Sequence, residues 1–129
     1  MIIDTSALVA IILDEPEGTS FVQLIREARW RRMASPALLE ACMVLAGRFE
    51  DDMVNRLDAL IGVLKIDPVP FTADHTAVAR SAFLRYGKGR HPAGLNFGDC
   101  ISYATAKLEA MPLLFKGDDF RLTDIEAAA

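Results

Sequence analysis

The sequence predicts an α/β fold in which a central, mainly parallel sheet lies between two layers of helices. Short strand-like segments alternate with longer helix-like segments along the whole chain, which is typical of a parallel sheet. The 129 residues are enough to bury one core, so we expect a single domain over residues 1–129. Hydrophobic residues make up 52% of the chain, which is enough for that core and for an apolar surface covered by another chain.

The elements of the N-terminal half follow from apolar spacing and capping residues. Thr5 and Ser6 can cap the first helix, and Pro16 limits its end. Pro36 suits the first turn of a later helix, with Ser35 as its cap. The expected elements are a strand over 1–4, a helix over 7–13, a helix from 18, a short strand over 32–35, a helix from 36 to Phe49, and a helix from Asp51 or Asp52 to 64.

The C-terminal half repeats the alternation. Two prolines in the extended segment 66–71 place it near a sheet edge. Thr72 and Asn96 are expected to cap helices, and three glycines make segment 87–94 the one flexible stretch. The expected elements are an extended segment over 66–71, helices over 73–86 and from 97 to about 108, a buried strand over 112–115, and a short last strand over 124–125.

Composition excludes several classes of protein. The net charge of −4 argues against a generic DNA-coating protein, and the longest apolar run, residues 7–13, is too short to span a membrane. Asp4 interrupts the apolar N-terminus, so we expect no secretory signal. Cys42 and Cys100 lack metal-type spacing and are interpreted as small buried thiols, which fits a reducing cytoplasm.

Four acidic residues at the ends of apolar runs are the strongest functional signal. Asp4, Glu40, Asp99 and Asp118 each follow or interrupt a segment expected to be buried. Burying a carboxylate is unfavourable unless a cation or hydrogen bonds compensate it. Four such residues, brought together only by folding, predict a site of oxygen ligands for a hard cation.

Each acid also has an ordinary structural explanation. Asp4 can cap the following helix, and Glu40 lies at the margin of a helix face and can point outward. Asp99 occupies the third helical position after the Asn96 cap, where a carboxylate interacts well with free amides. Asp118 belongs to a Gly-Asp-Asp run of ordinary turn composition. The functional hypothesis therefore depends on the set of acids.

The chain resembles the PIN-domain family, and within it the VapC-type toxins. The resemblance is carried by Ile-Ile-Asp-Thr-Ser-Ala at the N-terminus, the helical Glu40, Leu-Asn-Phe-Gly-Asp-Cys before residue 101, and Leu-Leu-Phe-Lys-Gly-Asp-Asp-Phe near the C-terminus. It implies a PIN-like three-layer α/β/α sandwich and metal-binding acids at Asp4, Glu40 and Asp99. The fourth acid is Asp118 or Asp119, because Phe-Lys-Gly stands where many relatives have a threonine; Asp118 is favoured, since Asp119 directly precedes Phe120.

The resemblance also implies a reaction and partners. The expected activity is Mg²⁺-dependent endoribonuclease cleavage, with Mn²⁺ as a substitute, by a water activated at a carboxylate-bound metal and leaving 5′-phosphate and 3′-hydroxyl ends. Thr5 or Ser6 is expected to position that water. The expected partners are RNA, a VapB-like antitoxin that covers the acidic site, and a second copy of the chain in a homodimer or a larger assembly with antitoxin.

Basic residues lie in two clusters of the sequence. Arg85, Lys88 and Arg90, with Tyr86 as a stacking face, predict RNA contacts in the loop that leads toward Asp99. An exposed tether with incidental charge is the alternative. The arginines between residues 26 and 32 are equally well explained as a solvated helix face.

Competing activities fail on particular residues. A haloacid-dehalogenase-type phosphatase would need an acid where Ser6 stands, and a receiver domain would need paired acids at the end of its first strand. No glycine-rich turn follows that strand, which excludes a P-loop or dinucleotide fold. His75 is expected on a helix surface and His91 in a loop, so no catalytic histidine is predicted. The alternative left open is a non-catalytic PIN-like module that binds RNA or protein.

Overall fold

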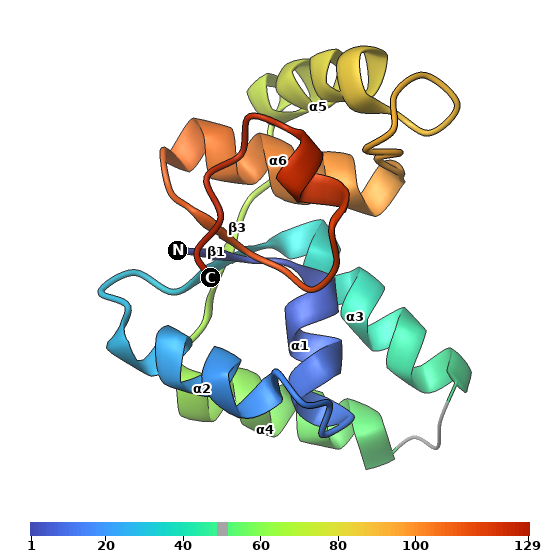
Figure 1. The fold of residues 1–129 in the computed structure, drawn as a ribbon. Helices are drawn as coiled ribbons and strands as arrows, with labels where there is room; N and C mark the ends of the chain where they lie inside the picture. The colour runs from blue at the N-terminus through green and yellow to red at the C-terminus, as the bar shows by residue number, and fades with distance from the viewer. Residues whose placement is uncertain (49–51) are drawn as a thin grey trace.

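The computed structural model describes residues 1–48 and 52–129 and confirms the alternation of strands and helices (Figure 1). Phe49 and Asp51, the predicted end of one helix and a predicted start of the next, lie outside the described residues. The elements are β1 (Ile2–Ile3), α1 (Thr5–Ile12), α2 (Gly18–Glu27), β2 (Arg32–Ala34), α3 (Ser35–Arg48), α4 (Asp52–Leu64), β3 (Asp67–Val69), α5 (Ala73–Tyr86), α6 (Phe97–Glu109), β4 (Leu113–Leu114) and the 3₁₀ helix η1 (Asp119–Leu122).

The four strands form one parallel sheet in the order β3-β2-β1-β4. Ile2 aligns with Arg32 on one side and with Leu113 on the other. The strand with a proline, β3, occupies an edge, as Pro68 requires because it has no N–H to donate to a ladder. Since every strand runs the same way, their carboxyl ends meet at one edge, where such folds place their ligands.

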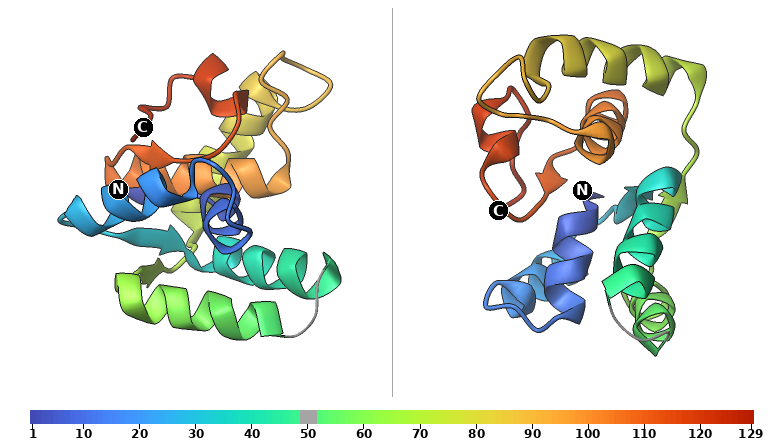
Figure 2. Two further views of the ribbon diagram at one scale, coloured as in Figure 1. Left: turned by 60° about the horizontal axis from the view of Figure 1, so that its bottom comes forward. Right: turned by 90° about the vertical axis from the view of Figure 1, so that its right-hand side faces the viewer.

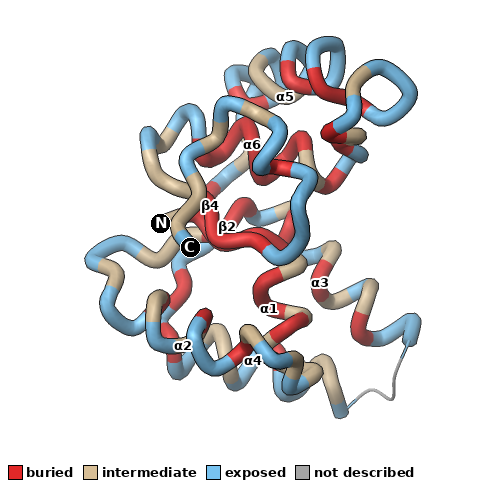
Figure 3. Tube along the Cα trace, viewed as in Figure 1, coloured by how far each residue is buried: buried red, intermediate tan, exposed pale blue. Residues whose placement is uncertain are grey.

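Helices cover the sheet on both sides, giving the predicted three layers (Figure 2). Helices α1 to α4 pack on one side, and α5 and α6 on the other. Successive strand residues point to opposite faces. Ile2 and Leu113 therefore join the core under α5 and α6, while Ile3 and Leu114 join the core with α1 to α4. Figure 3 shows the resulting central band of buried chain.

Three local predictions were wrong in detail. The cap of α1 is Asp4, not Thr5 or Ser6, because its side chain accepts from the Ser6 N–H. His75 is 7% exposed, since its ring completes a capping box with Thr72 at the start of α5. Segment 87–94 is a hydrogen-bonded turn closed by a bridge between Gly87 and Leu95.

The C-terminal segment pairs later than expected. Residues 124–125 form no strand; instead a single parallel bridge joins Leu113 to Ala127. Cys100 is buried and Cys42 half-buried, and neither forms a disulfide. None of the described helices combines the length and the apolar character needed to cross a bilayer.

Candidate active site

Asp4 lies where β1 ends, at the carboxyl edge of the sheet, and its carboxylate is held by hydrogen bonds. It is 4% exposed. Its Oδ2 accepts from the N–H of Ser6 at 3.0 Å and from the hydroxyl of Ser6 at 2.6 Å. Its Oδ1 accepts from the hydroxyl of Ser102 on α6 at 2.5 Å. Three donors satisfy the oxygens of this buried group and fix its orientation.

Asp99 occupies the first turn of α6, in a capping box with Asn96. The Asp99 N–H donates to the Asn96 side chain at 2.9 Å, and Asp99 Oδ2 accepts from the Asn96 N–H at 3.0 Å. Burial and then the negative charges of Asp4, Asp119 and Glu40 raise the pKa of Asp99 to about 6, against the effect of the Asn96 bond. Asp4, Glu40 and Asp119 therefore lie near enough for their negative charges to act on Asp99.

Glu40 reaches the same place from the second turn of α3. Its carboxylate rests on the backbone of Gly98, such that a Cβ at position 98 would be 2.1 Å from Glu40 Oε2. Gly98 is the residue before Asp99, so the absence of its side chain brings Glu40 beside Asp99. This geometry agrees with the prediction that Glu40 belongs with the other acids. It disagrees with the alternative interpretation, in which Glu40 points outward from its helix.

The sequence favours Asp118 as the fourth acid, but the structure gives a reason to prefer Asp119. The side chain of Asp118 is 93% exposed and lies 3.8 Å from Nε of Arg121. Asp119, by contrast, is one of the three charges that raise the pKa of Asp99. Asp118 precedes η1 and Asp119 is its first residue; both are exposed, and the effect on Asp99 is what distinguishes them. The structure favours Asp119, the residue that the sequence pattern assigns to the turn.

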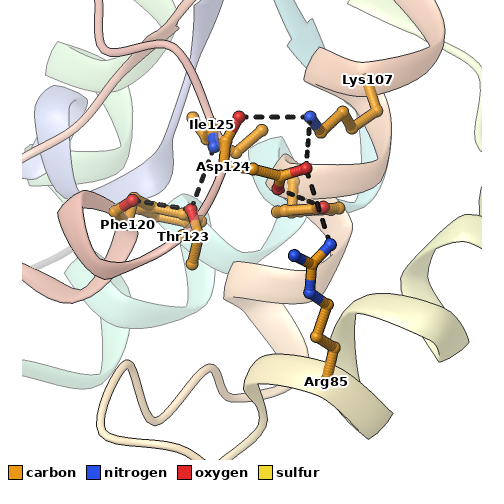
Figure 4. Close-up of polar contacts among 7 residues, drawn as sticks. Arg85, Lys107, Phe120, Thr123, Asp124 and Ile125 are labelled. Carbon is orange, nitrogen blue, oxygen red and sulfur yellow. Dashed lines mark hydrogen bonds and ion pairs between the residues drawn. The ribbon is translucent and has the colours of Figure 1, made fainter.

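Polar contacts of Asp124 hold the segment after η1 to helices α5 and α6 (Figure 4). The carboxylate of Asp124 accepts hydrogen bonds from the Tyr103 hydroxyl at 2.6 Å and from the Lys107 ammonium at 2.9 Å. Nη1 of Arg85 lies 3.9 Å from the same carboxylate. Because Tyr103 and Lys107 are on α6, which also carries Asp99, this cluster ties the Asp119 segment to the Asp99 helix.

The two residues predicted to position water have other roles. The Thr5 hydroxyl is buried and donates to the Ala37 carbonyl at 2.9 Å, joining α1 to α3. The Ser6 hydroxyl donates to Asp4 and accepts from the Lys116 N–H at 3.0 Å. The prediction is wrong for Thr5, and Ser6 orients a carboxylate instead.

The predicted RNA loop is only partly available. Tyr86 is 5% exposed and packs in the core against Tyr103, so its predicted stacking face is not offered to solvent. Arg85 lies over the Tyr86 ring, with 4.7 Å between its guanidinium and the ring centroid, and near Asp124. Lys88 and Arg90 are exposed, although Arg90 Nε also donates to a backbone carbonyl.

Sequence reasoning missed Ser102 and Gly98. Ser102 is three residues after Asp99 and therefore shares its helix face, which was a usable signal. It is 1% exposed and contacts Asp4 directly. Gly98 offers no such signal, because its role depends on where α3 brings Glu40.

The donor set fits a hard cation that keeps part of its water shell. Within residues 1–48 and 52–129, no three His, Cys, Asp or Glu side chains lie close enough to form a ready-made cage. Mg²⁺ is usually held by one or two carboxylates with several waters, so such a cage is not needed. Burial and then the neighbouring negative charges raise the pKa of Asp99, and a divalent cation bound there would favour its charged form.

The chain matches known proteins over its full length. A model of the PIN domain family matches residues 1–126. Ribonuclease VapC30 of Mycobacterium tuberculosis strain H37Rv is 45% identical over 129 residues, covering 100% of this chain and 98% of the relative. Ribonuclease VapC of Mycolicibacterium smegmatis is 46% identical over 127 residues, covering 98% of each chain.

Solved structures share the fold at low sequence identity. The crystal structure of VapC20 from Mycobacterium tuberculosis, described as a sarcin-ricin loop cleaving toxin, superposes with a TM-score of 0.78 at 16% identity, covering 96% of this chain and 95% of that one. A toxin–antitoxin complex from Klebsiella pneumoniae gives 0.68 at 18% identity, covering 92% and 88%. Together with the full-length relatives, these matches show that the chain belongs to the PIN-domain family and, within it, to the VapC ribonucleases.

Proposed function

We propose that this protein is the toxin of a toxin–antitoxin pair and acts as a Mg²⁺-dependent endoribonuclease through Asp4, Glu40, Asp99 and Asp119. The observation that carries the proposal is the gathering of acids around Asp99 at the carboxyl edge of the sheet, where Glu40 lies against Gly98 and the charges of Asp4, Glu40 and Asp119 act on Asp99. The ribonuclease names of its full-length relatives support the reaction class. The proposal includes a single PIN domain over residues 1–129, supported by the family match to residues 1–126, and action in a reducing cytoplasm, with which the free Cys42 and Cys100 agree.

Neighbouring residues hold three of the four acids in position. Ser6 and Ser102 hold the Asp4 carboxylate, the Asn96 cap fixes Asp99, and Gly98 admits Glu40. A divalent cation bound there supplies positive charge that activates water and stabilises the charge that develops on the cleaved phosphodiester. The four acids provide the negative field that concentrates the cation at the edge of the sheet.

The test is cleavage of RNA by purified protein with and without divalent cation. Asp4→Asn and Asp99→Asn are expected to abolish cleavage while the circular dichroism spectrum stays unchanged. Asp58→Asn is the control, because Asp58 is an exposed acid on α4. Full cleavage in excess EDTA would refute the proposal. RNA binding without cleavage under any metal would instead support the non-catalytic alternative.

We also propose a homodimer built on the apolar surface beside the site. Leu39 and Met43 on α3 are 62% and 64% exposed, and Phe97 at the start of α6 is 83% exposed. They line a hollow of about 550 Å³ that also contains Glu40 and Gly98, so a second copy bound here would extend the site. An exposed apolar surface of this kind is typical of an interface.

Sedimentation velocity tests the dimer. Met43→Ser with Phe97→Ser is expected to give a monomer at tens of micromolar, where the natural chain is a dimer. Val63→Ser is the matched control, since Val63 is 68% exposed but lies on α4. A natural chain that sediments as a monomer at that concentration would contradict the dimer.

The inhibitor is proposed to be a VapB-like antitoxin. The acidic site is suited to a partner's arginine or lysine, which would pair with the carboxylates in place of the cation. The likeness to a solved toxin–antitoxin complex supports a partner of this kind, including a larger assembly of toxin and antitoxin. An antitoxin without its C-terminal segment should fail to neutralise this toxin in co-expression, and full neutralisation would count against the proposal.

The exposed Lys88 and Arg90 are proposed RNA contacts. The turn that carries them leads into α6 and Asp99, and both side chains face solvent. Lys88→Ala is expected to weaken RNA binding and to lower the slope of log affinity against log salt by about 0.7 for single-stranded RNA. Lys65→Ala, which removes an exposed lysine after α4, is the control. Unchanged affinity and slope would assign the loop no part in binding.

A further inference from the structure

A half-exposed lysine just after β4 is paired with two acids from another part of the chain. The ammonium of Lys116 lies against Glu15 Oε2 and 2.8 Å from Glu17 Oε1. Glu15 and Glu17 are in the segment between α1 and α2. Those two oxygens are buried, and neither has a hydrogen-bond partner in the described chain, so the lysine is the charge that compensates them.

The same lysine is joined through its backbone to the proposed active site. Its N–H donates to the Ser6 hydroxyl at 3.0 Å, and that hydroxyl donates to Asp4 Oδ2 at 2.6 Å. Because a hydroxyl has a single proton, the bond from Lys116 leaves that proton directed at Asp4. The position of Lys116 therefore decides how Ser6 holds the Asp4 carboxylate.

We propose that Lys116 is a positioning residue that holds Asp4 in its metal-binding orientation, acting through Ser6. The ion pairs with Glu15 and Glu17 hold the segment after β4 against the segment between α1 and α2. The Lys116 N–H then fixes the Ser6 hydroxyl at the start of α1. The inference rests on the proposed function, because it concerns the same carboxylate. It adds a residue whose side chain pairs with Glu15 and Glu17, which are not among the four proposed metal-binding acids.

Charge is required at position 116. Without the ammonium, two neighbouring carboxylates would repel each other with their inner oxygens buried, and the segment between α1 and α2 would move away from β4. Movement of β4 would break the bond from residue 116 to Ser6 and allow the Ser6 hydroxyl to rotate. Lys116→Met retains most of the side-chain length but removes the charge, while Lys116→Arg retains the charge.

The test measures Mn²⁺ binding by titration calorimetry together with thermal unfolding. Lys116→Met is expected to weaken Mn²⁺ binding about 10- to 100-fold, the range for residues that support metal ligands. Lys116→Arg should recover most of that loss. Arg32→Met is the control, because Arg32 and Glu109 form a comparable ion pair, with side chains 30% and 23% exposed, at the opposite end of the strands. It should lower the melting temperature similarly and leave Mn²⁺ binding unchanged.

A double-mutant cycle with Ser6→Ala tests whether the effect of Lys116 on Asp4 is transmitted through Ser6. If Lys116 acts through Ser6, Lys116→Met should weaken Mn²⁺ binding little further in the Ser6→Ala background. Additive losses, or unchanged Mn²⁺ affinity in Lys116→Met, would overturn the inference. Should Lys116→Met fail to fold, the double variant Glu15→Gln with Glu17→Gln takes its place, because it removes both ion pairs that hold Lys116 and should likewise weaken Mn²⁺ binding. A natural chain that binds no Mn²⁺ would refute the proposed function itself, which separates the two failures.

Discussion

Replacing Gly98 with alanine should remove activity while leaving the fold at least as stable. Gly98 lies in the first turn of α6, and alanine there gains about 0.5–1 kcal/mol of helix stability over glycine. The new Cβ would be 2.1 Å from Glu40 Oε2 and 2.8 Å from its Cδ. The atoms that the new Cβ would meet belong to the flexible end of the Glu40 side chain. The backbone of α6 can therefore keep its position while the Glu40 carboxylate moves.

The displacement can be estimated from contact distances. Carbon and oxygen approach to about 3.3 Å, so Glu40 Oε2 has to move by about 1.2 Å from its position 2.1 Å from the new Cβ. A misplacement of about 1 Å in a catalytic site can lower the rate about 100-fold, or raise the barrier by about 2.7 kcal/mol. We therefore expect kcat/KM for RNA cleavage to fall by about that factor.

Cleavage of a fluorescent RNA oligonucleotide and urea denaturation together provide the assay. Gly62→Ala is the matched control, because Gly62 is a helical glycine on α4 where a new Cβ would meet no atom of the described residues within 4 Å. It should gain stability and keep full activity. Glu40→Ala should cause a loss of its own, and adding Gly98→Ala to it should cause little more. Gly98→Ala activity within twofold of the natural chain would refute the reasoning.

Three further outcomes follow from the site. Asp119→Asn should abolish cleavage and Asp118→Asn should retain it in the same RNA assay; the reverse result would favour Asp118 as the fourth acid. Asp99→Asn should raise the free energy of unfolding in metal-free buffer above pH 6 by about 1–2 kcal/mol. The rise of the Asp99 pKa from 3.8 to about 6 corresponds to roughly 3 kcal/mol, and solvent screening reduces that value. The pKa of Asp99 is higher in the folded chain than in the unfolded chain, so protonation of Asp99 stabilises the natural fold as the pH falls. The gain from Asp99→Asn should therefore fade toward pH 4 in urea titrations. For the same reason, the Mn²⁺ affinity of the natural chain should fall below about pH 6. Ser102→Ala removes a donor from buried Asp4 and should cost about 1–3 kcal/mol in urea unfolding and weaken Mn²⁺ binding, whereas unchanged values would mean that Ser102 does not hold Asp4.

Local sequence signals predicted most of the elements in their order, and the same signals led to the proposal of Asp4, Glu40 and Asp99 as site acids. Apolar spacing and capping residues are local signals, so Thr72 and Asn96 marked their helices to the residue. Asp4 and Asp99 were found because each lies next to such a signal, at a strand end and in a capped first turn. The prolines of segment 66–71 likewise identified an edge strand before the sheet order was known.

The tertiary structure decided what depends on direction and on distant neighbours. Neighbouring Asp118 and Asp119 have the same composition context and are both exposed, and only in the folded chain does the charge of Asp119 act on Asp99. The burial of Tyr86 depends on how α5 packs on α6, a contact that no local pattern encodes. Gly98 acquires its role because the fold brings Glu40 onto it from more than fifty residues away, and contacts of that kind appear only when the chain is folded.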